Sequence, residues 1–352
     1  MKPLIIGDLI AKVPVVQGGM GVGVSRSSLA GAVASCGGVG VISGAQVGYD
    51  EDDFEINPLK ANLRALKKHI LKAKEISKGG IIGVNLMVAM NYYEDHVKTC
   101  IESGVDLIIS GAGLPTALPK LVKGSSVKIA PIVSTSKALG VILKMWDRKE
   151  NTTADLIVVE GPKAGGHLGY HNDDLDNIDN IDYDGEFIKI LDIAKNYGDK
   201  FNKNIPVVAA GGIFTGDDVK KYIDMGASGV QVGTKFVATH ECDAAYEYKM
   251  TYVNSSQDDI KIVKSPVGMP GRAIENSFIK SVSSEGRKIK KCYNCLIPCN
   301  PSNTPYCISK ALIDAVRGDI ENGLLFCGSN AYKVDRLKNV SEVIDELTSK
   351  LY

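Results

Sequence analysis

Short apolar runs recur eight times between residues 13 and 232, and most are followed by a segment with helical spacing. Runs of branched apolar residues are typical of strands that are buried on both faces. Strands that alternate with helices form a parallel sheet, and eight of them fit a closed (β/α)8 TIM barrel better than an open doubly wound sheet. The predicted strands are Val13–Val16, Val39–Ile42, Ile81–Leu86, Leu107–Ile109, Val127–Val133, Leu156–Val159, Pro206–Ala210 and Gly229–Val232.

The segments between these runs have the spacing of helices that pack on such a sheet. In the longest of them, Leu63, Leu66 and Ile70 recur at intervals of three and four residues, which puts them on one face of a helix. Residues typical of helix caps flank these segments: Ser27 and Asp217 for N-caps, and Gly37, Gly104 and Gly226 for C-caps. The predicted helices are 27–36, 58–77, 95–103, 136–146, 187–197 and 217–225.

The length and charge of the chain limit its domain organisation and the kinds of partner it can have. We expect a barrel domain at residues 1–260 and an extension at residues 261–352 that packs on the barrel. The 41 basic residues balance the 41 acidic ones, so nothing indicates a nucleic-acid partner. The N-terminus lacks the long apolar run of a signal peptide, and no later run is as long as a membrane span. We therefore predict a cytoplasmic protein without a membrane partner, whose 8 cysteines are reduced.

A glycine-rich loop around one histidine follows the sixth predicted strand. The stretch from Leu156 to Gly169 reads LIVVEGPKAGGHLG, so Glu160 ends the strand and four glycines surround His167. Glycines let the backbone approach a flat ligand closely. A histidine in such a loop can position a small substrate or exchange a proton with it near neutral pH. The alternative is a glycine-rich turn with a solvated histidine.

Other loops at the carboxyl ends of the strands suit a flat, phosphorylated ligand, and in a (β/α)8 barrel the chemistry lies at these ends. The segment 17–23 after the first strand offers bare backbone, and Asn85 in the third strand offers an amide for the edge of a heterocycle. Glycine turns at Gly211–Gly212 and Gly233–Thr234 follow the last two strands, where this architecture usually binds phosphate. The glycines at 38, 40 and 44 lie before and within a strand, so we discount a dinucleotide-binding fingerprint.

The acidic segment 171–184 follows the histidine loop. Its acidity makes it a poor candidate for packing, and its spacing is not that of an EF-hand. We interpret it as a solvated loop at the edge of the site, with His171 on the surface.

Motifs at the strand ends occur in a recognisable order and spacing. They are Val16–Met20, Gly83–Leu86, Glu160–Gly161, Ala164–Gly169, Ala209–Ile213 and Val232–Phe236, followed by Arg272 and Asn276. Together they resemble FMN-dependent nitronate monooxygenases, formerly called 2-nitropropane dioxygenases, which share sequence pattern with the flavin-dependent type II enoyl-acyl-carrier-protein reductases. The resemblance spans about residues 10–280. It implies an FMN across the barrel mouth and His167 as the active-site histidine.

The resemblance also implies which residues hold the cofactor. At one position the sequence departs from the family, because Lys163 stands where relatives commonly carry an acid. Lys163 would either assist an anionic substrate or point to solvent. The implied cofactor-binding residues are Gly19, Met20 and Gly21 against the flavin, Asn85 near the ring, Glu160 toward the ribityl side or the strand end, Gly166 in the histidine loop, and Ala210, Gly211, Gly212, Gly233 and Thr234 at the phosphate.

Two reactions fit the FMN-dependent oxidoreductase that the resemblance implies. In the monooxygenase reaction, an alkyl nitronate and O2 give a carbonyl compound and nitrite, and His167 hydrogen-bonds the nitro oxygens or manages a proton. In the reductase reaction, NAD(P)H is the electron donor and an enoyl thioester the acceptor, whose carbonyl His167 orients. A non-redox barrel that binds a phosphorylated ligand is an alternative from another class.

The tail beyond the barrel begins with a turn-rich segment, Lys264–Ala273. Its prolines and glycines favour a fixed loop that folds back over the barrel mouth. Arg272 within it would pair with a phosphate, a carboxylate or a structural acid. Two further helices are predicted at 311–317 and 340–351, where they would pack on the barrel or form a homodimer contact.

A cysteine motif lies between this segment and the last helices. Cys292, Cys295, Cys299 and Cys307 follow the spacing C-x2-C-x3-C-x7-C. It loosely resembles the iron–sulfur run of other flavin reductases built on the same barrel, although their fourth cysteine is more distant. Four thiolates would hold an iron–sulfur cluster or zinc. The alternative is four cysteines that pack as small apolar residues.

Overall fold

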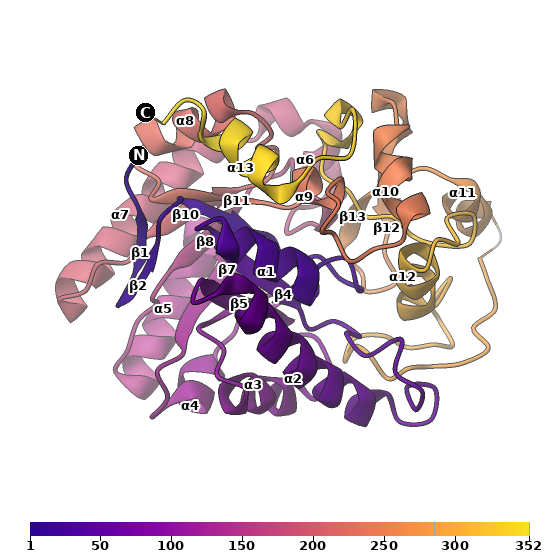
Figure 1. Cartoon of the computed structure of the whole chain (residues 1–352), viewed down its shortest axis with the longest axis horizontal. Helices are drawn as coiled ribbons and strands as arrows, with labels where there is room; N and C mark the ends of the chain where they lie inside the picture. Colours follow the sequence, from indigo (N-terminus) through magenta and orange to yellow (C-terminus); the bar gives the residue numbers. More distant parts are fainter. Residues whose placement is uncertain (285, 352) are drawn as a thin grey trace.

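Eight parallel strands close into a barrel in the computed structural model, which describes residues 1–284 and 286–351. Each barrel strand pairs with the next along the chain, and the last pairs with the first, with Val230 opposite Val15. All eight predicted strands are present, so the predicted TIM barrel is confirmed (Figure 1). The strands are β3 (Val15–Gln17), β4 (Val39–Ser43), β5 (Ile81–Met87), β6 (Leu107–Gly111), β7 (Lys128–Val133), β8 (Ile157–Glu160), β10 (Val207–Ala210) and β11 (Gly229–Val232).

Helices surround the barrel, and their apolar residues pack with the outer faces of the strands in one large core. The last helix, α13, comes from the end of the extension and packs between α1 and α8, where the eighth helix of the ring belongs. The surrounding helices are α1 (Ser27–Ser35), α2 (Pro58–Ser77), α3 (Tyr93–Glu102), α4 (Leu118–Val122), α5 (Ser136–Glu150), α7 (Tyr183–Phe201), α8 (Gly216–Asp224) and α13 (Val340–Thr348).

The predicted helix caps are partly wrong. Ser27 is the first residue of α1 rather than its N-cap. The N-cap of α8 is Thr215, not Asp217, because the Thr215 hydroxyl accepts a hydrogen bond from the Asp218 backbone N–H at 3.2 Å. That pairing is a capping box, which satisfies two backbone donors that a helix start otherwise leaves free. The three predicted glycines directly follow the cap residues of α1, α3 and α8 and have positive φ, as helix-ending glycines do.

A short antiparallel hairpin, β1 (Leu4–Ile6) and β2 (Leu9–Ala11), precedes the barrel and was not expected from the sequence. Leu4 and Ile6 are fully buried in one cluster with inward-facing residues of the barrel strands, such as Val16 and Leu107. Figure 1 shows the hairpin at the end of the barrel opposite the extension. The hairpin therefore plugs the closed end of the barrel and leaves the other end for the site.

The opposite end, the barrel mouth, is covered by insertions. After β8, the two-residue strand β9 (Gly166–His167) joins β12 (Ile260–Lys264) and β13 (Pro270–Ile274) in a three-stranded sheet. The turn-rich segment thus does fold over the mouth, but as a β-hairpin rather than a loop. The acidic segment contains two short helices, so its interpretation as a loop was incomplete. They are α6 (Asn172–Asp176) and η1 (Ile178–Asn180).

Helices α11 (Ser277–Ser284) and α12 (Ile308–Val316) of the extension lie on the right in Figure 1, whereas α13 lies near α8. The predicted domain boundary at residues 260 and 261 falls within β12, and the division stays a prediction. Both late helices are present at the predicted places. None of the helices in the described ranges is long and apolar enough to cross a membrane. The remaining elements are α9 (Thr234–Val237), α10 (Tyr246–Val253), η2 (Gln257–Asp259) and η3 (Ala331–Lys333).

The contact between α1 and β4 makes one glycine a test of the fold. A Cβ atom at Gly40 would lie 1.8 Å from the Ala30 carbonyl oxygen, which is backbone and cannot move aside. We expect Gly40→Ala to lower the free energy of unfolding by about 3 kcal/mol or more. Gly140→Ala in α5 is the control, because nothing lies within 4 Å of its Cβ position and alanine favours helix by about 1 kcal/mol. Denaturant unfolding should therefore shift in opposite directions for the two variants, and equal shifts would contradict this packing.

Candidate active site

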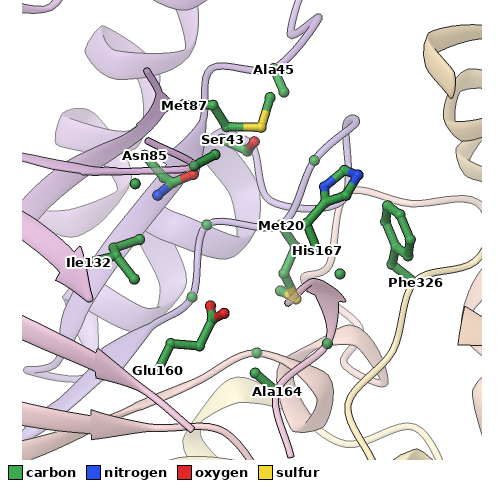
Figure 2. A pocket seen from close by; sticks show the side chains of 18 of the residues that line it. Met20, Ser43, Ala45, Asn85, Met87, Ile132, Glu160, Ala164, His167 and Phe326 are labelled. Carbon is green, nitrogen blue, oxygen red and sulfur yellow. The ribbon is translucent and has the colours of Figure 1, made fainter. Parts of the chain in front are cut away.

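A cavity of about 520 Å³ opens at the barrel mouth, where the strands end. Every residue that the sequence predicted for catalysis or cofactor binding lines it, so the structure brings the whole predicted set together. The set comprises Gly19, Met20, Gly21, Asn85, Glu160, Gly166, His167, Ala210, Gly211, Gly212, Gly233 and Thr234. Figure 2 shows Met20, Glu160 and His167 around the same space.

Backbone of the β3–α1 loop lies directly on the ends of the neighbouring strands. A Cβ atom at Gly19 would lie 2.4 Å from Cβ of Asn85, and one at Gly21 would lie 2.6 Å from Oγ of Ser43. The Met20 backbone N–H donates to Oγ of Ser25 at 2.7 Å, which fixes the loop. These contacts explain why glycines occupy the loop: any side chain would lift the backbone off the strands. The loop thus presents bare main chain to the cavity.

His167 is held at the cavity by three different contacts. Its backbone pairs with Gly271 of β13, which fixes where the side chain leaves the chain. Its ring meets the Phe326 ring edge-on, with centroids 5.0 Å apart, as Figure 2 shows. Its Nε2 atom lies 2.7 Å from Oγ of Ser265. Burial lowers the pKa of His167 to about 4, so the imidazole is neutral at pH 7.

Ser265 connects His167 to the β12–β13 hairpin. Its oxygen accepts from the backbone N–H of Val267 at 3.4 Å and is the atom that bonds to Nε2 of His167. A hydroxyl has one proton and two lone pairs, so Ser265 donates to Nε2 in one tautomer of the ring and accepts from it in the other. In either tautomer the hydrogen bond fixes the orientation of the imidazole.

Glu160 ends β8 and lines the same cavity. Burial raises the pKa of Glu160 to about 8, although Arg272 opposes the shift. The carboxyl is therefore mostly protonated at pH 7. Sequence reasoning left Arg272 between a phosphate, a carboxylate and a structural acid. Its guanidinium donates through Nη1 to the carbonyl oxygens of Pro162, at 2.9 Å, and Ala164, which attaches it to the histidine loop. Its charge also acts on the Glu160 carboxyl, and a contact with phosphate stays a prediction.

The turns after β10 and β11 form an open cradle of backbone. Gly211 and Gly212 both have positive φ, +94° and +78°, which glycine adopts at no steric cost. Sequence reasoning did not foresee that the C-terminal segment Gly328–Asn330 closes the third side of this cradle. The side-chain amide of Asn330 donates to the Gly212 carbonyl oxygen at 2.6 Å. The turn-forming sequence Gly-Ser-Asn was the one signal that could have drawn attention to this segment.

The extension also supplies a wall of the cavity that was not predicted. The segment Tyr293–Leu296 lines it, together with Ser309 of α12. Backbone hydrogen bonds attach this segment to the loop after β5, from Asn91 N–H to the Cys295 oxygen at 3.0 Å and from Ile297 N–H to the Ala89 oxygen at 2.8 Å. No local sequence pattern predicts such a contact, because the contact joins residues about 200 positions apart in the sequence.

Comparison with known proteins agrees with this site. The sequence profile of the nitronate monooxygenase family matches residues 2–350. The chain belongs to the nitronate monooxygenase family. A probable nitronate monooxygenase of Staphylococcus saprophyticus is 27% identical over 305 residues, which cover 79% of this chain and 80% of that protein. A second one, from Staphylococcus aureus, is 25% identical over 296 residues and 77% of each chain.

Two solved structures extend the comparison. FabK from Thermotoga maritima superposes with a TM-score of 0.72 at 26% identity, covering 97% of this chain and 93% of that one. A nitroalkane oxidase from Streptomyces ansochromogenes has a TM-score of 0.73 over 97% of this chain and 96% of that one, and its 19% identity supports the fold alone. As a member of the nitronate monooxygenase family, the protein is an oxidoreductase, and the family implies a flavin cofactor.

One residue of the cysteine motif, Cys295, lines the cavity. In the described part of the chain, no three His, Cys, Asp or Glu side chains are arranged to hold a metal ion. The site of Cys292, Cys295, Cys299 and Cys307 therefore stays a prediction from sequence spacing. Cys292 is exposed and the other three are half-buried. Burial raises the pKa of Cys295 to about 11, so this thiol is protonated at pH 7.

The pKa of His167 predicts how its burial affects stability. Because the folded-state pKa is about 4 and the ordinary value 6.5, the unfolded chain takes up this proton first as the pH falls. The folded state therefore loses stability between about pH 6.5 and pH 4. We expect His167→Gln to lose less stability than the wild type over this interval in denaturant titrations. Glu160 titrates in both proteins, so identical losses in the two would contradict a neutral, buried His167.

Proposed function

We propose that this protein is an FMN-dependent nitronate monooxygenase, which converts an alkyl nitronate and O2 to a carbonyl compound and nitrite. The observation that carries the proposal is the neutral His167, fixed by Ser265 and Phe326 at a cavity floored with bare backbone. Family membership and the probable nitronate monooxygenases among its relatives support it. The cytoplasmic location and a homodimer stay predictions.

The residues at the cavity fit FMN. Gly19 and Gly21 line the cavity without a side chain that would keep a flat ring away, and Gly211 and Gly212 line it with the backbone turn after β10. The Ser329 Oγ atom is buried at the cradle without a hydrogen-bond partner among the described residues, which a phosphate oxygen would supply. The residues that would hold FMN are Gly19, Met20, Gly21 and Asn85 at the ring, Glu160 and Gly166 beside it, and Ala210, Gly211, Gly212, Gly233 and Thr234 at the phosphate.

The mechanism assigns His167 the task of holding the substrate. When bound, FMN would supply the electron chemistry, taking electrons from the nitronate and passing them on to O2. A nitronate is already an anion, so the site needs no strong base. In the tautomer that accepts from Ser265, His167 carries its proton on Nδ1 and can donate a hydrogen bond to a nitronate oxygen, which orients the anion. The protonated Glu160 adds no negative charge that would repel it, because burial raises its pKa to about 8.

A second candidate function is an NAD(P)H-dependent flavin reductase that acts on an enoyl thioester. It is favoured by the sequence motifs shared with the type II enoyl-acyl-carrier-protein reductases. The same His167 would then donate to a thioester carbonyl, so the barrel residues alone do not separate the two reactions. A barrel that binds a phosphorylated ligand without redox chemistry is the candidate from another class.

An anaerobic titration tests the proposal. Purified protein reconstituted with FMN should be yellow, and ethylnitronate without air should bleach the flavin absorbance. Bleaching by NADPH with no response to nitronate would favour the reductase instead. If no flavin spectrum appears after reconstitution, the non-redox barrel is favoured. We expect His167→Ala to lower kcat/KM for nitronate about 100-fold or more while the Kd of FMN changes less than threefold.

The Ser265 hydroxyl should act through His167 rather than on the substrate. We expect Ser265→Ala to lower kcat/KM for nitronate about tenfold, because the imidazole loses the hydrogen bond that fixes its orientation. Ser265→Thr keeps a hydroxyl and should retain more activity than the alanine variant. In the His167→Ala background, the Ser265 substitution should have no further effect on kcat/KM. An equal loss in both backgrounds would contradict the positioning role.

A further inference from the structure

We propose that the C-terminal segment Gly328–Asn330 recognises the phosphate of the cofactor, through the Ser329 hydroxyl, and so distinguishes FMN from riboflavin. The proposal rests on the proposed function, because it assigns these residues to the same cofactor site. Sequence reasoning placed the phosphate on the two glycine turns alone. The structure adds a third wall from the far end of the chain.

Three hydrogen bonds hold the segment against three different barrel loops. The Gly328 N–H donates to Oγ1 of Thr234 after β11, at 2.9 Å. The Ser329 N–H donates to the Lys163 carbonyl oxygen after β8, at 3.2 Å. The Asn330 side chain donates to Gly212 after β10. These three bonds attach the residues on both sides of Ser329, and Ser329 itself, to barrel loops. The Ser329 side chain therefore has a defined place at the cradle.

Two hydroxyl donors are available on the walls of this cradle. Oγ of Ser329 is buried and bonds to none of the described residues. The Thr234 hydroxyl accepts from Gly328 N–H, so its own proton is available to a further acceptor. A buried hydroxyl without a partner is rare in native proteins, and an anion with several oxygens would accept from both hydroxyls together.

The charges around the cradle favour an anion. Glu160 is the one acidic side chain among the described residues that line the cavity, and its raised pKa keeps it mostly protonated at pH 7. Lys163 lines the same cavity, and its aliphatic stem lies against Gly212, 2.8 Å from the position that a Cβ would take there. Lys163 therefore places a cationic side chain beside the cradle. Among the described residues that line the cavity, no carboxylate that is ionised at pH 7 opposes an anion there.

FMN and riboflavin separate phosphate recognition from ring recognition, because the two flavins differ only in the phosphate. Apoprotein is titrated with each flavin, and flavin fluorescence gives the Kd. We expect Ser329→Ala to weaken FMN binding about tenfold, since a hydrogen bond to a charged group is lost. The Kd of riboflavin should stay within about twofold of the wild-type value. Ser302→Ala, on an exposed part of the extension, is the matched control and should change neither Kd.

Three results would overturn the proposal. One is an unchanged Kd of FMN in Ser329→Ala, and another is an equal loss for both flavins, which indicates a structural role. The third is a failure of Ser329→Thr, which keeps the hydroxyl, to bind FMN better than the alanine variant. If the wild-type protein binds neither flavin, the proposed function itself is contradicted. This result differs from the three above, so failure of the phosphate proposal and failure of the proposed function are distinguishable.

Hydrogen exchange in the unmodified protein gives a measurement that needs no variant. If the segment closes on the phosphate, FMN at saturation should slow amide exchange across residues 326–331 more than riboflavin does. Equal protection by the two flavins would contradict the proposal. The riboflavin-bound protein is the control, because it fills the same ring site.

Discussion

A single buried guanidinium holds the pieces of this site together. Arg272 is 5% exposed, and it donates to two carbonyl oxygens of the loop between β8 and β9. Its own backbone pairs with Gly166 on one side and accepts from Cys327 N–H at 3.0 Å on the other. The histidine loop, the β12–β13 hairpin and the C-terminal segment therefore meet at one residue. A buried charge needs hydrogen-bond partners, and Nη1 finds two of them on the histidine loop. The backbone of the same residue joins that loop to the hairpin and to the C-terminal segment.

This arrangement explains why the extension belongs to the site. The floor and the two glycine turns come from the barrel strands and the loops that follow them. The histidine is different, because its backbone lies in a strand that pairs with the hairpin of the extension. Phe326 then packs on its ring, and Ser265 bonds to its Nε2 atom. Most residues that would hold the cofactor thus come from the barrel part of the sequence. The residues that orient His167 come from the extension that follows it.

The features that depend on local sequence pattern could be predicted from the sequence. Buried strands were found because their apolar runs are short and bounded by polar or glycine residues, and strand-end glycines were found because parallel strands bring their carboxyl ends together. Contacts that depend on the pairing of distant strands were not foreseen. The bond from Ser265 to His167 follows from the register of β13 against β9, which no local spacing encodes. For the same reason the carbonyl partners of Arg272 in the histidine loop were not foreseen.

The placement of α13 has a consequence for how the protein folds. The ring of outer helices is complete only when α13 fits between α1 and α8, and α13 lies about 300 residues after α1 in the sequence. A contact between residues so far apart in the chain forms slowly, because a long loop must close before it is made. A folding intermediate that lacks α13 would therefore expose an apolar surface of α1, which chaperones can bind.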